Sequence, residues 1–322
     1  MKKIGVMTSG GDAPGMNACI RAVVRAGIHF NVQVYGIRSG YQGMIDNKIK
    51  LLKSNSVANI IQNGGTILKT ARCLEFLEPE GRQKAYENLK KHGIEGLVVI
   101  GGNGTYTGAL HLNKEFGIPI VGCPGTIDND LSGTDYTIGF HTSINTAVDA
   151  IDKIRDTADS HNRVFFIEVM GRHSGHIALH AGIAGGAEGI FIPERENEFE
   201  TLVKRYDQKA RSKEFSIFVV AEGEEEGNAY KIAEKFKTRY PFADCRVTVL
   251  GHVQRGGSPT SYDRILASRL GAHAIKGLTE GFKHHAVGIV NHEIVYTDFA
   301  EAIYGKKDIN ANLWEMNTFL GQ

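Results

Sequence analysis

Short apolar runs alternate with longer stretches of mixed polarity along most of the chain. The runs, each ending near a glycine or a small polar residue, are KKIGVMTS, QVYGI, EGLVVIGG, IPIVGC, RVFFIEVMG, EGIFIPE, FSIFVVAEG and CRVTVLGH. Continuous Val- and Ile-rich runs separated by helical stretches predict buried strands of mainly parallel sheets with helices on both faces. About eight strand–helix units predict two doubly wound, Rossmann-like α/β lobes, with a closed barrel as the structural alternative.

The longest predicted helix covers residues 141–162. Ile144, Val148, Ile151 and Ile154 recur there at a spacing of three or four residues. This spacing places them on one side of a helix, which predicts one face packed against a core.

Composition and charge narrow the class of protein. The 322-residue chain is 42% hydrophobic and 23% charged, with a formal net charge of +1. No apolar run approaches the roughly 18 residues that span a bilayer, and the start MKKIGVMTSGG reads as a first strand. We therefore expect a cytoplasmic protein with neither membrane nor nucleic-acid partners. The cysteines are far apart, which favours free thiols over a metal cluster; they are Cys19, Cys73, Cys123 and Cys245.

Two glycine turns follow strands of the predicted sheet, where ligands of open α/β sheets bind. TSGGDAPGMN has the glycine spacing of a P-loop, but Met16 and Asn17 stand where Lys and Ser/Thr are required. A plain tight turn is the alternative there. GGNGTYTGAL lacks the dinucleotide spacing, and the strand after it ends without an acidic residue, so a dehydrogenase is disfavoured. The second turn is suited to phosphate, yet the side chain at its centre is the neutral amide Asn103.

A cluster of carboxylates follows the next strand. CPGTIDNDLSGTD places Asp128, Asp130 and Asp135 within eight residues, after Thr126. A solvated loop with Asx turns is the alternative, but this position favours acid–base work or magnesium binding.

Arginines and histidines follow further strands. Arg172 lies in MGRHSGH, where a planar guanidinium is available to phosphate, and its neighbours His173 and His176 suit a helix start better than a metal site. Other candidates at strand ends or beside glycine turns are Arg72, Arg163, Glu222, His252 and Arg255. Glycine turns, carboxylates and arginines together favour phosphoryl transfer, with Asp128 on an acceptor hydroxyl and Arg172 on the transferring group.

The motifs TSGGDAPGMNA, PGTIDND, GTDYTIGF, MGRHSGH and LGHVQRGGSP closely resemble those of the bacterial ATP-dependent 6-phosphofructokinases, from about Lys2 to about Ile303. The resemblance implies the phosphofructokinase-like fold and a homotetramer. It implies transfer of phosphate from ATP, with Mg²⁺, to the 1-hydroxyl of fructose 6-phosphate in glycolysis. It also implies a larger ATP-binding lobe, residues 1–139 plus 252–305, and a smaller sugar-phosphate-binding lobe, residues 140–251 plus 306–322.

The resemblance assigns roles to individual residues. Asp128 would act on the 1-hydroxyl of the sugar. Thr126, Asp130 and Arg172 would serve the transferring phosphate. The residues that would line the ATP site are Gly11, Tyr41, Arg72, Cys73, Gly102, Asn103, Gly104 and Thr105. Those that would hold the sugar phosphate are Met170, Gly171, Glu222, His252 and Arg255, joined by Arg163 and Arg246 of a neighbouring subunit.

The choice of phosphoryl donor depends on two glycines. Pyrophosphate-dependent members of the family carry an acidic residue and a lysine where this chain has Gly104 and Gly125. Those side chains fill the space that a nucleotide needs. Glycine at both positions therefore favours ATP.

The chain departs from the family at Asn103, where an aspartate that helps to hold magnesium is usual. We expect Asp130 and the ATP phosphates to carry the ion, with a raised magnesium requirement. A second hypothesis is deamidation at Asn103-Gly104, which would create the carboxylate after synthesis; intact amide in fully active protein would exclude it.

A second departure lies at the site where the family binds ADP and phosphoenolpyruvate. The matching residues are Arg21, Arg25, Arg155, Glu188, Arg211 and Lys213. However, Ser54 replaces an arginine and Asn59 an aspartate, so we expect weak or altered effector control.

Two other functions stay open at this point. A non-catalytic regulatory paralogue that binds sugar phosphate or nucleotide is supported by Asn103 and Ser54 alone. Retention of Asp128 and Arg172 favours the enzyme, and a pyrophosphate-dependent kinase is the lesser alternative.

Overall fold

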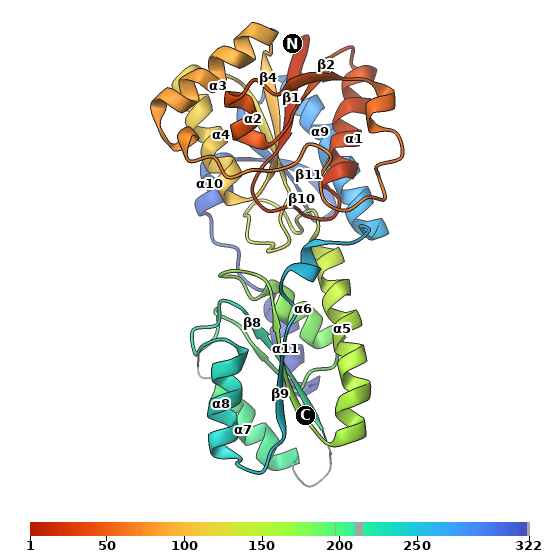
Figure 1. Ribbon diagram of the computed structural model, residues 1–322, viewed down its shortest axis with the longest axis vertical. Coiled ribbons are helices and arrows are strands. Elements are labelled where there is room, and N and C mark those ends of the chain that lie inside the picture. Colours follow the sequence, from red (N-terminus) through yellow and green to blue (C-terminus); the bar gives the residue numbers. More distant parts are fainter. Residues whose placement is uncertain (197, 210–214, 321–322) are drawn as a thin grey trace. The chain divides into compact units, whose positions relative to one another are not determined.

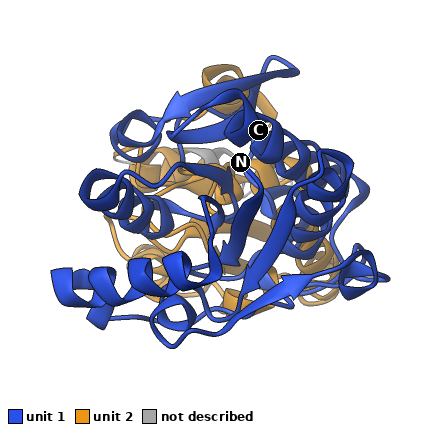
Figure 2. Ribbon diagram, turned by 90° about the horizontal axis from the view of Figure 1, so that it is seen from above, with its two compact units in different colours: residues 1–127, 131–142, 255–307 blue, residues 128–130, 143–254, 308–322 orange. Residues whose placement is uncertain are grey.

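The computed structural model describes residues 1–196, 198–209 and 215–320 (Figure 1). The chain forms two compact units, which Figure 2 shows in different colours. Unit 1 comprises residues 1–127, 131–142 and 255–307, and unit 2 comprises residues 128–130, 143–254 and 308–322.

Unit 1 is built on a seven-stranded sheet in the order β11-β10-β5-β4-β1-β2-β3. The strands are β1 (Lys3–Thr8), β2 (Gln33–Ile37), β3 (Ile49–Leu52), β4 (Gly96–Gly101), β5 (Ile120–Pro124), β10 (His284–Val290) and β11 (Glu293–Asp298). The edge strands β3 and β11 run antiparallel to their neighbours, and the other pairs are parallel. The carboxyl ends of β1, β4 and β5 therefore meet at one edge of the sheet.

Helices cover both faces of this sheet (Figure 1). They are α1 (Met16–His29), α2 (Gly40–Ile45), α3 (Pro79–His92), α4 (Asn103–Phe116), α9 (Ser261–Glu280) and α10 (Phe299–Tyr304), with the short 3₁₀ helices η1 (Ser54–Val57) and η2 (Glu75–Leu77). α1 and α9 pack closely at Gly271. A Cβ at this position would lie only 2.6 Å from Cys19 O, so the contact requires glycine. Met7, Val99 and Tyr106 belong to the buried cluster between the sheet and the helices of the other face.

Unit 2 contains a four-stranded parallel sheet in the order β7-β8-β6-β9. The strands are β6 (Val164–Val169), β7 (Gly189–Phe191), β8 (Ser216–Ala221) and β9 (Cys245–Val249). The helices are α5 (Phe140–His161), α6 (His176–Ala184), α7 (Glu198–Lys209), α8 (Ala229–Arg239) and α11 (Ala311–Leu320), with the 3₁₀ helix η3 (Gly251–Arg255). Phe166, Phe218 and Phe236 form the centre of its buried aromatic core.

Local sequence explains where several helices begin. The side chain of Asn228 accepts a hydrogen bond from Lys231 N, and that of Thr260 accepts one from Asp263 N. These N-caps satisfy amides that a first helical turn leaves unpaired. Pro79 opens α3, where its missing N–H costs nothing.

The predicted mixed α/β fold with mainly parallel sheets is confirmed. All eight apolar runs form strands, and the predicted helix over 141–162 is α5. Both sheets are open, so the closed barrel is wrong. The strands β3, β10 and β11 were not among the predictions. The predicted lobes of 1–139 plus 252–305 and 140–251 plus 306–322 differ from the two units at residues 128–130 and 252–254, which group with unit 2, and at residues 140–142 and 306–307, which group with unit 1.

No helix among the described residues is long and apolar enough to cross a membrane.

Candidate active site

The glycine turn after β1 holds an arginine against bare backbone. Gly10 and Gly15 have φ of +81° and +110°, which favour glycine. A Cβ at Gly11 would lie 2.4 Å from Nη1 of Arg255, and this Nη1 donates a hydrogen bond to Asp12 O at 3.4 Å. The guanidinium of Arg255 thus lies directly against this turn within unit 1. A plain tight turn does not require such a contact.

Asn17, which stands where a P-loop has Ser or Thr, fixes a neighbouring segment of backbone. It is 1% exposed, its Nδ2 donates to Asn63 O at 3.0 Å and Gly64 O at 3.1 Å, and its Oδ1 accepts from Ile67 N at 2.8 Å. The amide therefore fastens the irregular segment that leads to Arg72, an exposed residue.

The second glycine turn opens α4. Gly102 is the N-cap and Asn103 the first helical residue, so the positive end of the helix lies at the predicted phosphate turn. Thr105 is 2% exposed, and its Oγ1 donates to Ser9 O at 3.0 Å, which joins this turn to the end of β1. Phosphate groups could approach both turns at the same edge of the sheet.

The two glycines that are predicted to select the phosphoryl donor have different surroundings. A Cβ at Gly104 would meet nothing within 4 Å, whereas one at Gly125 would lie 3.0 Å from Ile100 Cγ2 and 3.1 Å from Met16 Cε. Gly104 thus borders open space, and Gly125 lies against the core.

Two predicted ATP-site residues are partly or fully covered. Tyr41 is 6% exposed, stacks on Phe76 with ring centroids 4.0 Å apart, and donates its hydroxyl hydrogen bond to Thr105 O at 2.5 Å. Burial raises the pKa of its phenol. Cys73 is half-buried, and burial raises the pKa of its thiol. Tyr41 thus supports the first turn of α4 from within.

The segment after β5 carries the predicted catalytic carboxylate. Thr126 belongs to unit 1, and its carbonyl accepts from Thr137 Oγ1 at 2.6 Å. Asp128 and Asp130 belong to unit 2; Asp128 is 5% exposed, and its carbonyl accepts from Ser174 Oγ at 3.0 Å. The backbone around both residues is therefore fixed.

Asp135, the third carboxylate of this sequence cluster, has a structural role. Its Oδ2 accepts from Asn291 N at 2.8 Å, in the turn between β10 and β11, and its carbonyl accepts from Lys307 Nζ at 3.1 Å. Asp135 therefore joins the β10–β11 hairpin to the loop that follows β5.

In unit 2, the turn after β6 has an unusual backbone. Gly171 has a φ of +150° and Arg172 a φ of +57°. Oε1 of Glu222 accepts from Arg172 N at 2.7 Å and from Gly171 N at 3.3 Å. The predicted sugar-phosphate residue Glu222 thus also holds the turn that presents the exposed Arg172.

The two histidines of this turn lie at a helix start, as predicted. His173 is exposed and His176 opens α6. No group of three or more His, Cys, Asp or Glu side chains that could hold a metal gathers within the part of the chain that the structure describes.

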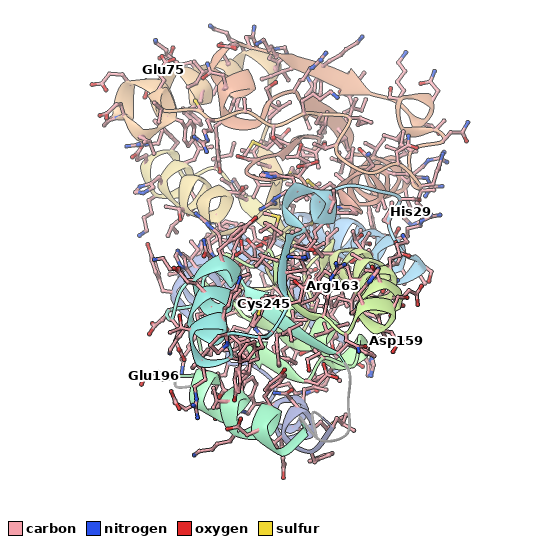
Figure 3. All side chains as sticks on the ribbon, turned by 60° about the horizontal axis from the view of Figure 1, so that its bottom comes forward. His29, Glu75, Asp159, Arg163, Glu196 and Cys245 are labelled. Carbon is pink, nitrogen blue, oxygen red and sulfur yellow. The ribbon has the colours of Figure 1, made fainter. Side chains whose placement is uncertain are left out.

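Arg163 and Arg246 share one carboxylate. Arg163 Nε lies 2.8 Å from Asp244 Oδ2, and Arg246 Nη2 lies 3.0 Å from Asp244 Oδ1. The hydrogen bond from Arg163 lowers the pKa of Asp244. Figure 3 labels Arg163 beside Cys245 in unit 2. The structure thus brings these two arginines together on one subunit.

The predicted effector residues differ in accessibility. Arg21 is half-buried and Arg25 exposed on α1, whereas Glu188 is 4% exposed and its Oε2 accepts from Ile217 N at 2.7 Å. Arg155 donates to the carbonyls of Gly185 and Gly186. Arg211 and Lys213 lie outside the described residues.

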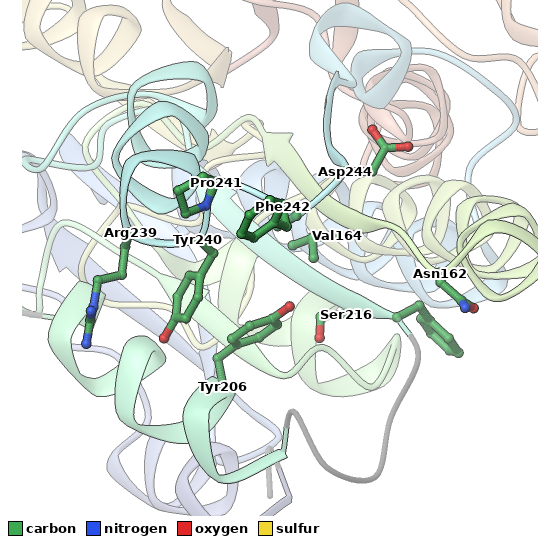
Figure 4. Close-up of a pocket in the computed structure, with 11 residues that line it drawn as sticks. Asn162, Val164, Tyr206, Ser216, Arg239, Tyr240, Pro241, Phe242 and Asp244 are labelled. Atoms are coloured by element: carbon green, nitrogen blue, oxygen red, sulfur yellow. The ribbon is translucent and has the colours of Figure 1, made fainter.

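A cavity of about 490 Å³ lies elsewhere in unit 2 (Figure 4). Its walls include Tyr206, Ser216, Tyr240, Phe242 and Asp244, at the amino-terminal ends of β8 and β9. It contains none of the predicted substrate residues, and the sequence carried no signal for it.

Sequence reasoning missed two buried polar residues that hold predicted site segments. Asp263 is 0% exposed, and its Oδ1 and Oδ2 accept from Gly139 N at 2.9 Å and Thr142 N at 2.8 Å. Burial raises the pKa of Asp263. Gln254 is also 0% exposed. The available signal for Gln254 was its place between His252 and Arg255.

Open parallel sheets with glycine turns, aspartates and arginines at the carboxyl ends of strands are typical of α/β phosphotransferases. Residues 3–278 match the family described as Phosphofructokinase. The chain belongs to the phosphofructokinase family.

Named relatives and solved structures agree with this membership. The chain is 57% identical over 321 residues to "ATP-dependent 6-phosphofructokinase 1" of Thermus thermophilus, covering 99% of each chain. It is 56% identical over 314 residues to the ATP-dependent 6-phosphofructokinase of Cytophaga hutchinsonii, covering 97% of this chain and 96% of the relative. Phosphofructokinase from Saccharomyces cerevisiae superposes with a TM-score of 0.90 at 36% identity, covering 100% of this chain and 48% of the yeast chain. A pyrophosphate-dependent phosphofructokinase from Marinobacter aquaeolei shares the fold, with a TM-score of 0.83 at 24% identity, covering 97% of this chain and 86% of that chain.

Proposed function

We propose that this chain is an ATP-dependent 6-phosphofructokinase, a glycolytic kinase that transfers the γ-phosphoryl group of ATP to the 1-hydroxyl of fructose 6-phosphate. The observation that carries the proposal is 56–57% identity, over nearly the whole length, to relatives with that name. These relatives also favour the enzyme over a regulatory paralogue and over a pyrophosphate-dependent kinase.

The open space at Gly104 supports ATP as the donor. Nothing lies within 4 Å of a Cβ at this position, so a nucleotide meets no side chain there. The turns at Gly11 and Gly102 offer backbone amides to the phosphates, and Arg72 adds a flexible cation.

Asp128 and Arg172 carry the chemical step. Asp128 orients the 1-hydroxyl of the sugar and accepts its proton as the oxygen attacks the γ-phosphorus. Arg172 and Thr126 meet the charge on the transferring group, and the bond to the bridging oxygen of ADP breaks. Because little covalent chemistry is required of the protein, positioning supplies most of the rate.

The acceptor sugar is held by residues that follow β6 and β8 and by residues of η3. They are Met170, Gly171, Glu222 and His252, with Arg255 and, from a neighbouring subunit of a homotetramer, Arg163 and Arg246. Asp244 forms ion pairs with both Arg163 and Arg246 and so holds the two guanidinium groups near each other. Two neighbouring cations suit a doubly charged phosphate.

The side chains of Asp130 and Asn103 fit Mg²⁺ by their donor chemistry. Both supply oxygen, the ligand atom that Mg²⁺ prefers, and Mg²⁺ usually takes only one or two protein ligands beside substrate phosphates and water. Bound magnesium would neutralise charge on those phosphates. Asn103 supplies no charge of its own.

Effector binding by ADP or phosphoenolpyruvate would use Arg21, Arg25 and Arg155, with Arg211 and Lys213. Ser54, in η1, offers no cation where the family has arginine. We propose weakened control, and full activation by ADP in a steady-state assay would contradict it.

A coupled assay with fructose 6-phosphate tests the function. ATP is expected to give turnover that depends on magnesium, and pyrophosphate none. Turnover with pyrophosphate and none with ATP would identify a pyrophosphate-dependent kinase instead. Binding of both substrates without turnover would support the regulatory paralogue.

A further inference from the structure

Gln254 is a buried amide in the middle of a segment of exposed residues. It lies on η3, is 0% exposed, and follows His252 and Val253, which are both exposed. Glutamine is seldom fully buried, because both ends of its amide then need partners inside the protein. The side chain therefore has a specific position within unit 2.

The amide joins three segments of unit 2. Its Oε1 accepts a hydrogen bond from Met170 N at 2.8 Å, at the end of β6, and its Nε2 donates to Ser143 Oγ at 3.3 Å, in the first part of α5. Ser143 is 0% exposed, so this contact is shielded from water. Both ends of the Gln254 amide are thus used.

Met170 N is a donor that the sheet cannot satisfy. The last strand contacts of β6 are Leu250 N to Glu168 O at 3.0 Å and Glu222 N to Val169 O at 2.9 Å. Beyond them, the three successive amides of Met170, Gly171 and Arg172 are accepted by side chains, the first by Gln254 and the next two by Glu222.

The turn needs this support because its backbone is strained. The left-handed φ of +57° at Arg172 is unfavourable for a residue with a side chain and persists only where neighbours hold it. The bond from Met170 N to Gln254 thus adds to the two bonds from Gly171 N and Arg172 N to Glu222 that hold this turn.

We propose that Gln254 is a positioning residue for the acceptor half of the reaction: it locks the Met170–Gly171–Arg172 turn to η3, and hence to His252. This inference rests on the proposed function, because it takes these segments as the sugar-phosphate side. Gln254 itself contacts no substrate. It acts through Met170 and through the helix that carries His252.

The test compares Gln254→Met, which keeps the length of the side chain and loses both hydrogen bonds, with Gln254→Glu, which keeps the acceptor. We expect Gln254→Met to raise KM for fructose 6-phosphate about tenfold or more, with KM for ATP within about twofold of wild type. Gln254→Glu should raise KM for the sugar less. A merely structural role would not separate the two substrates.

Asn88→Leu is the matched control. Asn88 is a buried amide of unit 1, 7% exposed, whose Nδ2 donates to Met44 O at 3.1 Å and Ile45 O at 2.8 Å, and it belongs to no proposed site. Its loss should lower thermal stability and leave both KM values unchanged.

An unchanged KM for fructose 6-phosphate in folded Gln254→Met, or equal rises for both substrates, would overturn the proposal. If Gln254→Met does not fold, Ser143→Ala takes its place. It frees Nε2 alone, and the same selective rise of smaller size is expected, while no rise would overturn the proposal. Wild-type protein without turnover would reject the proposed function itself, which separates the two failures.

Discussion

At the scale of single residues, Asn103 is the feature that most distinguishes the proposed donor site. It is the first residue of α4, and Thr107 Oγ1 donates to its carbonyl at 2.9 Å, so its backbone is held in a helical turn. A held backbone disfavours the ring closure that deamidation requires. Asn103 is therefore expected to stay an amide in active protein, and peptide mass spectrometry checks this.

Asn103→Asp is expected to lower the magnesium concentration for half-maximal rate severalfold, because a carboxylate adds charge to the ligands of the ion. A magnesium titration at saturating ATP and fructose 6-phosphate measures it. Asn55→Asp, at an exposed asparagine of η1, supplies the same charge as a control. Identical magnesium curves for wild type and Asn103→Asp would contradict the role.

Glu224 is a second residue with a measurable signature. It is 7% exposed, and its Oε2 has no hydrogen-bond partner among the described residues. Burial, reinforced by Glu226, Glu198 and Glu225, raises the pKa of its carboxyl to about 7. The folded protein then holds a proton that the unfolded chain releases, so the free energy of unfolding falls as pH rises from about 5 to about 7.

Glu224→Gln should remove this slope and stabilise the protein at pH 8 by on the order of 1–3 kcal/mol, with little effect at pH 5. Urea unfolding at the two pH values measures the change. Glu225→Gln, at the exposed neighbour, is the control and should retain the slope. The same slope in Glu224→Gln would show that another group is responsible.

At the scale of elements, strands buried on both faces were predictable and edge elements were not. Val98 and Val219 lie in continuous apolar runs that only a covered parallel strand explains. The antiparallel edge strand β3 covers only four residues and exposes Lys50. The hairpin of β10 and β11 turns at Asn291 and His292, both with positive φ; this two-residue turn was the signal available for it.

The sequence predicts Arg172 as a residue at the end of a strand, and the structure shows it exposed there; its role stays a prediction. The candidate site was not predictable where a polar side chain serves the backbone. The sequence places Asp135 in a carboxylate cluster, yet its Oδ2 accepts a hydrogen bond from Asn291 N, and nothing in the local sequence indicates that Gln254 Oε1 accepts one from Met170 N. Such contacts join positions far apart in the chain, which local spacing cannot reveal.

The first turn of α4 allows a test of donor selection. Gly104→Asp should leave stability nearly unchanged, because its Cβ meets nothing within 4 Å. It should raise KM for ATP about tenfold or more, because the carboxylate enters the space of the nucleotide and repels its phosphates. His111→Asp, at an exposed position of the same helix, is the control. Unchanged KM for ATP in Gly104→Asp would remove the structural argument for the nucleotide.

At the scale of the whole molecule, the proposed chemistry draws on residues of both units. Gly11, Asn103 and Thr126 belong to unit 1, whereas Asp128 and Arg172 belong to unit 2. Each unit folds around its own sheet and core, and residues such as Gly11 in unit 1 and Arg172 in unit 2 follow the carboxyl ends of strands. Substitutions at Gly104 in unit 1 are therefore expected to change KM for ATP, and substitutions at Gln254 in unit 2 are expected to change KM for fructose 6-phosphate.

The most direct test of the central claim is the rate of fructose 1,6-bisphosphate formation from ATP by wild type and Asp128→Asn. We predict product with ATP and none with pyrophosphate, and a loss of kcat of about 10²–10⁴ in Asp128→Asn, with binding of fructose 6-phosphate retained. Product from pyrophosphate alone, or full turnover by Asp128→Asn, would contradict the account.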